Sequence, residues 1–235
     1  MDLIKNSWKK ADFSEFHKYE QSLKGSARDC EWEQKIVNTK LECFARTSTK
    51  ARVAAKEIKK GAYLEFLDGL EIGNMFDSLV YAHLISSIKD FDVFEKYLDK
   101  FVLTIDSWAS ADTLRFAKKD KERLVKLSNK YLKDERPFVR RVGVNIWFEL
   151  IKDNHYIDKA FCLLDSLKDE DEYYVNMSGA WLLSFCMIYD REKTIRYFEN
   201  DQTNKFIVNK GISKCRDSYR VSAEDKQLLL GFKVK

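Results

Sequence analysis

Apolar residues recur at steps of three and four along almost the whole chain. Two examples are the run Phe76, Leu79, Val80 and Leu84 and the run Phe91, Phe94, Leu98 and Phe101. This spacing places the side chains of each run on one face of an α-helix, and no comparable run of strict apolar and polar alternation appears. The pattern therefore predicts an all-α protein.

The same periodicity predicts a long series of helices joined by short connectors such as "DGLEIGN" and "KDERP". The predicted helices span about 10–24, 29–44, 48–59, 60–71, 74–89, 91–104, 106–117, 120–133, 137–152, 156–168, 171–189, 191–200, 203–214 and 221–231. Short connectors favour antiparallel neighbours, and many such pairs in succession favour a stacked solenoid over a four-helix bundle.

A loose self-similarity accompanies this series of helices. A charged turn followed by an apolar helix returns about every 35–45 residues, which is typical of degenerate HEAT-type repeats. We therefore expect residues 1–235 to form a single HEAT-like repeat domain, an α-α superhelix with a concave groove.

Composition supports helices and excludes several classes of protein. The 235 residues include one proline and eight glycines, so the usual punctuation of strands is scarce. The five cysteines, Cys30, Cys43, Cys162, Cys186 and Cys215, form no C-x-x-C pair, which argues against a metal site or a disulfide framework. No stretch has the length of a membrane span or the apolar core of a signal peptide. We expect a cytoplasmic protein without a metal or an organic cofactor.

Charge is distributed unevenly, although the net charge is only +4. Residues 115–141 contain eleven Lys and Arg against four Asp and Glu, whereas residues 142–175 contain three against eight. Residues 205–220 are again basic, with five against one. Charge alone favours solvated helix faces for these runs, and the alternative is a basic surface, the predicted concave groove, that attracts polyanions.

The stretch "TIDSWASADTLRFA", residues 104–117, contains the first candidate for chemistry. Asp106 and Ser107 suit the N-cap of a helix, and four residues then follow at steps of four, three and four: Trp108, Asp112, Arg115 and Lys119. They form one helical face with an indole, a carboxylate and two cations. The structural alternative is a buried Trp108 beside a surface ion pair.

Two further stretches contain candidate residues. In "KDERPFVRRVGVNIW", Pro137 suits the first turn of a helix, which places Arg140 and Arg141 near its N-terminus. Positive charge at that end opposes the helix dipole. Either an anion docks there, or the nearby Asp134 and Glu135 neutralise the two arginines. In "YYVNMSGAWLLSFCMIYD", residues 173–190, the helix is apolar almost all round. Taken alone, that setting favours a core position for Trp181.

Other familiar sites are absent from the sequence. His17, His83 and His155 lie far apart without the spacing of metal ligands, and no glycine-rich phosphate loop occurs. Nucleotide hydrolysis is therefore disfavoured.

Taken in order, "IDSWASADTL", "PFVRRVGVNIWFELI", "SGAWLLSFCMIYDREKTIRYF" and "NKFIVNKGISKCRDSYRVSAEDKQLL" resemble the DNA alkylation repair (AlkD-like) family of HEAT-repeat DNA glycosylases. The resemblance is strongest over residues 75–231 and weaker over 1–74. It implies release of cationic N3- or N7-alkylated purines from double-stranded DNA in base excision repair, by a monofunctional enzyme that acts without a base-flipping pocket.

The resemblance also implies roles for individual residues. Asp112 corresponds to the family's catalytic aspartate, Trp108 and Trp181 to its aromatic cradle for the deoxyribose, and Arg141 to its phosphate-contacting arginine. The expected basic surface adds candidates for contacts with the DNA backbone, namely Arg115, Lys119, Arg140, Lys210, Lys214 and Arg216.

These side chains suit the implied reaction. Loss of a cationic base builds positive charge on the sugar, which a carboxylate and two indole faces can stabilise. A neutral base would need a general acid as well, so we expect only cationic lesions as substrates, and a solenoid around a duplex can act as a monomer. The alternative is a helical-repeat module that binds nucleic acid or protein without catalysis.

Overall fold

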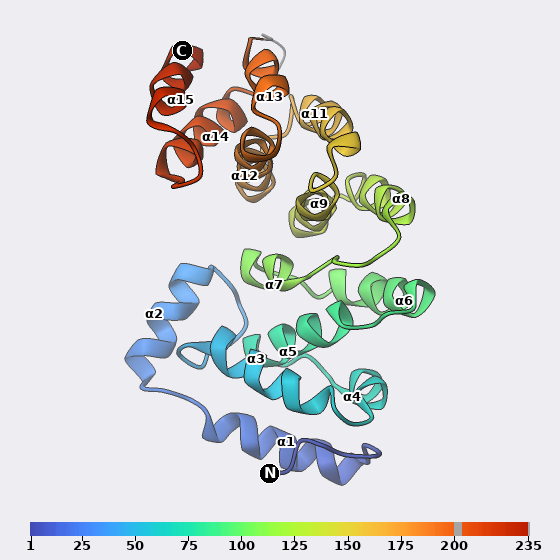
Figure 1. Ribbon diagram of the computed structural model, residues 1–235. Helices are drawn as coiled ribbons and strands as arrows, with labels where there is room; N and C mark the ends of the chain where they lie inside the picture. Colours follow the sequence, from blue (N-terminus) through green and yellow to red (C-terminus); the bar gives the residue numbers. More distant parts are fainter. Residues whose placement is uncertain (200–203, 235) are drawn as a thin grey trace. The chain divides into compact units, whose positions relative to one another are not determined.

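The computed structural model describes residues 1–199 and 204–234, and every regular element in them is a helix (Figure 1). No β-strand occurs in these two ranges. The predicted fold class, all-α, is confirmed. None of the described helices has the length and apolar character needed to cross a membrane.

The chain divides into two compact units, residues 1–119 and 120–235. Each unit is described by itself. The predicted superhelix, its concave basic groove and the single repeat domain over 1–235 remain predictions.

Unit 1 is built around α5, which is buried on nearly all sides and lies between α3 and α7 (Figure 1). Its N-cap is Asn74, whose side chain accepts a hydrogen bond from the backbone of Asp77. Aromatic rings from the N-terminal segment, including Trp8 and Phe16, pack on Phe66. The helices are α1 (Lys10–Ser22), α2 (Ala27–Val37), α3 (Thr47–Ile58), α4 (Tyr63–Gly69), α5 (Met75–Ser86), α6 (Phe91–Val102) and α7 (Trp108–Thr113).

Unit 2 is built around α12, which packs between α9 and α14 (Figure 1). Two glycines allow the close approach of α12 and α14: a Cβ on Gly179 would lie 2.9 Å from Ile207 Cδ1, and one on Gly211 would lie 3.3 Å from the carbonyl oxygen of Ala180. The helices are α8 (Lys121–Tyr131), α9 (Pro137–Asn145), α10 (Trp147–Leu150), α11 (Ile157–Ser166), α12 (Tyr173–Tyr189), α13 (Arg191–Phe198), α14 (Lys205–Asp217) and α15 (Ala223–Leu228), with 3-10 turns at Asn154–Tyr156 and Leu229–Phe232.

Three predicted helices end or break earlier than expected. The helix predicted over 29–44 ends at Val37 because Asn38 adopts the left-handed conformation, with φ 54°. The helix predicted over 106–117 ends at Thr113, after which Leu114 becomes extended and both Leu114 and Phe116 turn into the core. The helix predicted over 137–152 breaks at Ile146 between α9 and α10.

The two predicted helices that border residues 200–203 agree in their described parts. Helix α13 ends at Phe198, and α14 begins at Lys205 and continues to Asp217, three residues beyond its predicted end. Residue 200 of the first prediction and residue 203 of the second lie outside the described residues.

Candidate functional site

The start of α7 differs from the predicted cap. Ser107 occupies the N-cap position, but its buried hydroxyl makes no capping hydrogen bond. The carboxylate of Asp106 points elsewhere: it accepts hydrogen bonds from Thr39 Oγ1 at 2.7 and 2.8 Å and from the backbone N–H of Lys40 at 2.8 Å. Asp106 therefore fastens the loop after α2 to the entrance of α7.

Helix α7 presents Trp108 and Asp112 at the surface of unit 1. Its opposite side is anchored to α5, because the buried hydroxyls of Ser110 and Ser78 lie 2.7 Å apart and Ala111 is fully buried. Trp108 and Asp112 are both half-buried, one helical turn apart. The indole N–H of Trp108 donates to the carbonyl of Ile36 at 3.4 Å. An indole and a carboxylate thus share one partly exposed face.

Arg115 lies just after α7 and caps the C-terminal carbonyls of this helix with its side chain. Its guanidinium donates from Nη1 to the backbone oxygens of Asp112 at 2.5 Å and Leu114 at 2.8 Å. Positive charge at a helix C-terminus is favourable. Burial, helped by Arg115 and Arg52, lowers the pKa of the nearby His83 to about 4, so this imidazole is neutral at neutral pH.

The prediction of one helical face continuing to Lys119 is wrong, because α7 ends at Thr113. The ammonium of Lys119 instead donates to the carbonyl of Ile88 and lies 4.5 Å from the centre of the Phe94 ring. Burial lowers the pKa of Lys119. The charged group of Lys119 therefore binds partners inside unit 1.

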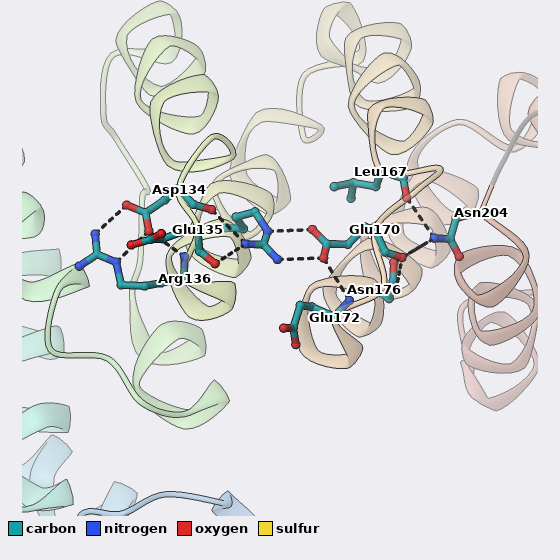
Figure 2. Close-up of polar contacts among 9 residues, drawn as sticks. Asp134, Glu135, Arg136, Leu167, Glu170, Glu172, Asn176 and Asn204 are labelled. Atoms are coloured by element: carbon teal, nitrogen blue, oxygen red, sulfur yellow. Dashed lines mark hydrogen bonds and ion pairs between the residues drawn. The ribbon is translucent and has the colours of Figure 1, made fainter.

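In unit 2, Arg140 binds protein groups through Nε and both terminal nitrogens, and its partners Asp134, Glu135 and Glu170 are labelled in Figure 2. Nε and Nη2 donate to the two carboxylate oxygens of Glu170 at 2.8 and 2.9 Å, and Nη1 donates to the backbone carbonyls of Asp134 and Glu135. The carboxylate of Asp134 binds Arg136 instead, which lowers the pKa of Asp134 to about 2. Arg140 therefore has a structural role, joining the start of α9 to the segment before α12.

Arg141 is the next residue on α9, but its surroundings differ. It is only 5% exposed, and its guanidinium donates to the carbonyl of Tyr174 on α12. A buried arginine needs such partners because an unpaired charge away from water is costly. The structure thus shows one role for Arg141 in packing α9 against α12.

Trp181 does not occupy the core position that its helix alone suggests. It is 41% exposed on α12, with the rings of Phe148 and Phe185 packed edge-on at 5.7 and 6.3 Å between centroids. The ammonium of Lys214 on α14 lies 5.0 Å from the centre of the indole. Trp181 is therefore a supported aromatic side chain on the surface of unit 2, with a cation over it.

The remaining basic candidates lie on α14. Lys210 and Arg216 are exposed, and Lys210 is one helical turn from Lys214.

The aromatic neighbours of Trp181 were not predicted from the sequence, although their spacing could have indicated them. Phe185 and Tyr189 follow Trp181 at steps of four, which places all three rings on one side of α12.

Within residues 1–199 and 204–234, no group of three or more His, Cys, Asp or Glu side chains is arranged to hold a metal ion. All five cysteines are free.

The comparisons with known proteins identify a family. No curated protein and no solved structure matches the chain significantly. A model of the family described as DNA alkylation repair enzyme matches residues 5–214, a range that includes Trp108, Asp112, Arg141 and Trp181. The match also includes most of the N-terminal part, where the resemblance in sequence is weaker. Since this range is most of its length, the chain belongs to the DNA alkylation repair enzyme family.

Proposed function

We propose that this protein is a monofunctional DNA glycosylase that hydrolyses the N-glycosidic bond of cationic N3- or N7-alkylated purines in duplex DNA. It acts as a monomer, without a metal or cofactor and without a base-flipping pocket. The observation that carries the proposal is the shared, partly exposed face of Trp108 and Asp112 on α7 in a member of a DNA alkylation repair family.

The carboxylate of Asp112 is the group that stabilises the positive charge developing on the sugar. A cationic purine leaves with the electron pair of the glycosidic bond, so the sugar gains oxocarbenium character. A preorganised carboxylate stabilises this cation and orients the water that adds to it.

The indoles of Trp108 and Trp181 provide the aromatic surfaces. Each ring face attracts a cation at about 0.5–2 kcal/mol, depending on how well water is excluded. The ammonium of Lys214 lies 5.0 Å from the centre of the Trp181 ring, so the sugar must use another part of this indole or displace the lysine.

Basic residues of both units are the proposed contacts with the DNA backbone. Lys210 and Arg216 are exposed, and Lys214 and Arg115 lie beside Trp181 and Asp112 respectively. Arg141 is proposed as a phosphate contact from the family resemblance. Arg140, Arg141 and Lys119 are weaker candidates on structural grounds, because their charged groups are used inside their own units and Arg141 is only 5% exposed.

Release of free base tests the proposal directly. Wild-type protein is incubated with duplex DNA containing 7-methylguanine, and released base is quantified by chromatography. We expect release by the wild type and a loss of about 100-fold or more in Asp112→Asn, since removal of one preorganised charge-stabilising group has effects of that order. Trp181→Ala should lower the rate as well.

The matched control is Asp92→Asn, which removes an exposed carboxylate from α6 in the same unit and should leave the rate unchanged. Absence of release in the wild type, or undiminished release in Asp112→Asn, would contradict the catalytic assignment. Duplex binding without release would favour the non-catalytic binding module.

A further inference from the structure

Helix α2 lies almost entirely at the surface of unit 1. Of its residues only Val37 is buried, while Trp32 is 66% and Ile36 51% exposed. Trp32 and Ile36 are four residues apart and share one side of the helix. A short helix normally gains its stability by burying such an apolar side, so this side of α2 is suited to a binding partner.

The helix is nevertheless held firmly by polar contacts. The carboxylate of Glu33 accepts hydrogen bonds from the backbone N–H of Thr47 at 2.9 Å and from its hydroxyl at 2.5 Å. The side chain of Ser26 caps the N-terminus. Trp32 is therefore presented on an ordered element.

The exposed side of α2 continues into the proposed site. Ile36, on the same side as Trp32, accepts the indole N–H of Trp108 at its carbonyl oxygen. The loop after α2 is joined to Asp106, two residues before Trp108, through Thr39 and Lys40. Whatever docks against Trp108 thus meets the end of α2 as well.

The surroundings of Trp32 suit a nucleic acid. Its ring lines a concavity of about 610 Å³ together with two cations, Arg28 and Lys35, one carboxylate, Glu31, and the amide of Gln34. Aromatic side chains stack on bases or wedge between base steps, while flanking cations neutralise phosphates.

We propose that Trp32 is a DNA-binding residue that packs against a base of the duplex held at Trp108, with Arg28 and Lys35 beside the flanking phosphates. The proposal rests on the proposed function, because it takes its partner from the DNA bound at the α7 site. It adds a second aromatic contact in unit 1 that serves binding and not bond cleavage.

Binding of a catalytically silent protein tests this role. Full-length Asp112→Asn is titrated against a fluorescent duplex containing 7-methylguanine, and Kd is measured by anisotropy at several salt concentrations. Adding Trp32→Ala should raise Kd about tenfold, as expected for one lost stacking contact. The slope of log Kd against log salt should stay unchanged, because an indole releases no counterions. Trp32→Phe should recover most of the affinity.

The control is Leu64→Ala, which removes an exposed apolar side chain from α4 and should leave Kd unchanged. A Kd within twofold of the parent in Trp32→Ala would overturn this inference, and so would a parent that does not bind the duplex. Base release by the wild type is measured separately. The proposed reaction therefore stands or fails on that result, whatever Trp32 does.

Discussion

At the scale of single residues, the most unusual environment is a pair of buried carboxyl groups between α1 and α5. The side-chain amide of Asn74 donates to Glu20 Oε1 at 3.1 Å and to Asp77 Oδ2 at 2.9 Å, while Glu20 Oε2 and Asp77 Oδ1 are buried without a hydrogen-bond partner among the described residues. Burial, followed by the adjacent Glu20, raises the pKa of Asp77 well above its ordinary value. His17 lies on the solvent side of the pair, 2.6 Å from Glu20 Oε1.

This pair predicts a pH-dependent stability. Below the ordinary pKa of an aspartate, Asp77 is protonated in both the folded and the unfolded chain. As pH rises, the unfolded chain releases this proton while the folded chain keeps it. The free energy of unfolding therefore falls by up to about 1.4 kcal/mol for each pH unit. We expect the free energy of unfolding of wild type to fall relative to that of Asp77→Asn between about pH 5 and pH 8, in urea titrations.

The difference between the two proteins removes the contribution of titrating groups that lie away from Asp77, and Asp92→Asn should behave like wild type. Curves that run parallel across this pH range would show that Asp77 does not hold the proton.

At the scale of elements, the ion pair of Arg140 and Glu170 connects the start of α9 to the segment before α12. The carboxylate is only 10% exposed, and the backbone oxygen of Glu170 accepts from the side chains of Asn176 and Asn204 at 2.7 and 3.0 Å (Figure 2). Both ends of the pair are thus built into the packing of unit 2.

Removing either partner should therefore destabilise the protein. A buried ion pair that loses one member leaves an unpaired charge, which costs about 3–5 kcal/mol. Because part of this pair is exposed, we expect Glu170→Gln to lower the free energy of unfolding by about 2 kcal/mol, and Arg140→Gln to lower it by a similar amount. Urea unfolding measures both losses.

This comparison also distinguishes two roles of Arg140. A structural role predicts that the two variants lose similar stability and bind duplex DNA alike at a temperature where both are folded. If Arg140→Gln alone weakens DNA binding, Arg140 contacts the DNA backbone after all.

At the scale of the whole molecule, the distribution of charge determines how the protein should respond to salt. The net charge is only +4, but basic residues are concentrated in 115–141 and 205–220. Affinity from phosphate contacts falls linearly with log salt, with a slope of about −0.9 for each neutralised phosphate.

We expect binding of Asp112→Asn to an undamaged duplex to weaken steeply between about 50 and 200 mM salt, and Lys210→Met and Arg216→Met each to reduce the slope by about 0.9. Lys152→Met, which removes a lysine paired with Glu149, is the control and should leave the slope unchanged. A slope near zero for the parent would exclude a phosphate-binding surface.

The fold class could be predicted well from sequence because the helical period of apolar residues is a local property. Every long predicted helix exists, and most ends differ by one to three residues. The errors fall where a tertiary contact overrides the local pattern. The loop after α2 leaves the helix at Asn38 to reach Asp106, and Leu114 and Phe116 leave α7 to enter the core.

The candidate site was predictable only in part. The order of Trp108, Asp112, Arg141 and Trp181 along the chain suffices to suggest the family, and the family match confirms it. The chemistry of each side chain could not be assigned from spacing, because adjacent arginines on one helix have different partners: Arg140 binds Glu170, and Arg141 donates to Tyr174.

The sequence by itself determined the all-α class and the positions of most helices, since both follow from periodicity and from the scarcity of proline and glycine. Only the tertiary structure decided which side chains meet the solvent. Trp181 is exposed although its helix is apolar almost all round, and Lys119 is drawn inward although lysines usually face water. The physical reason is that exposure depends on what packs against each face of a helix, and those neighbours come from distant parts of the chain.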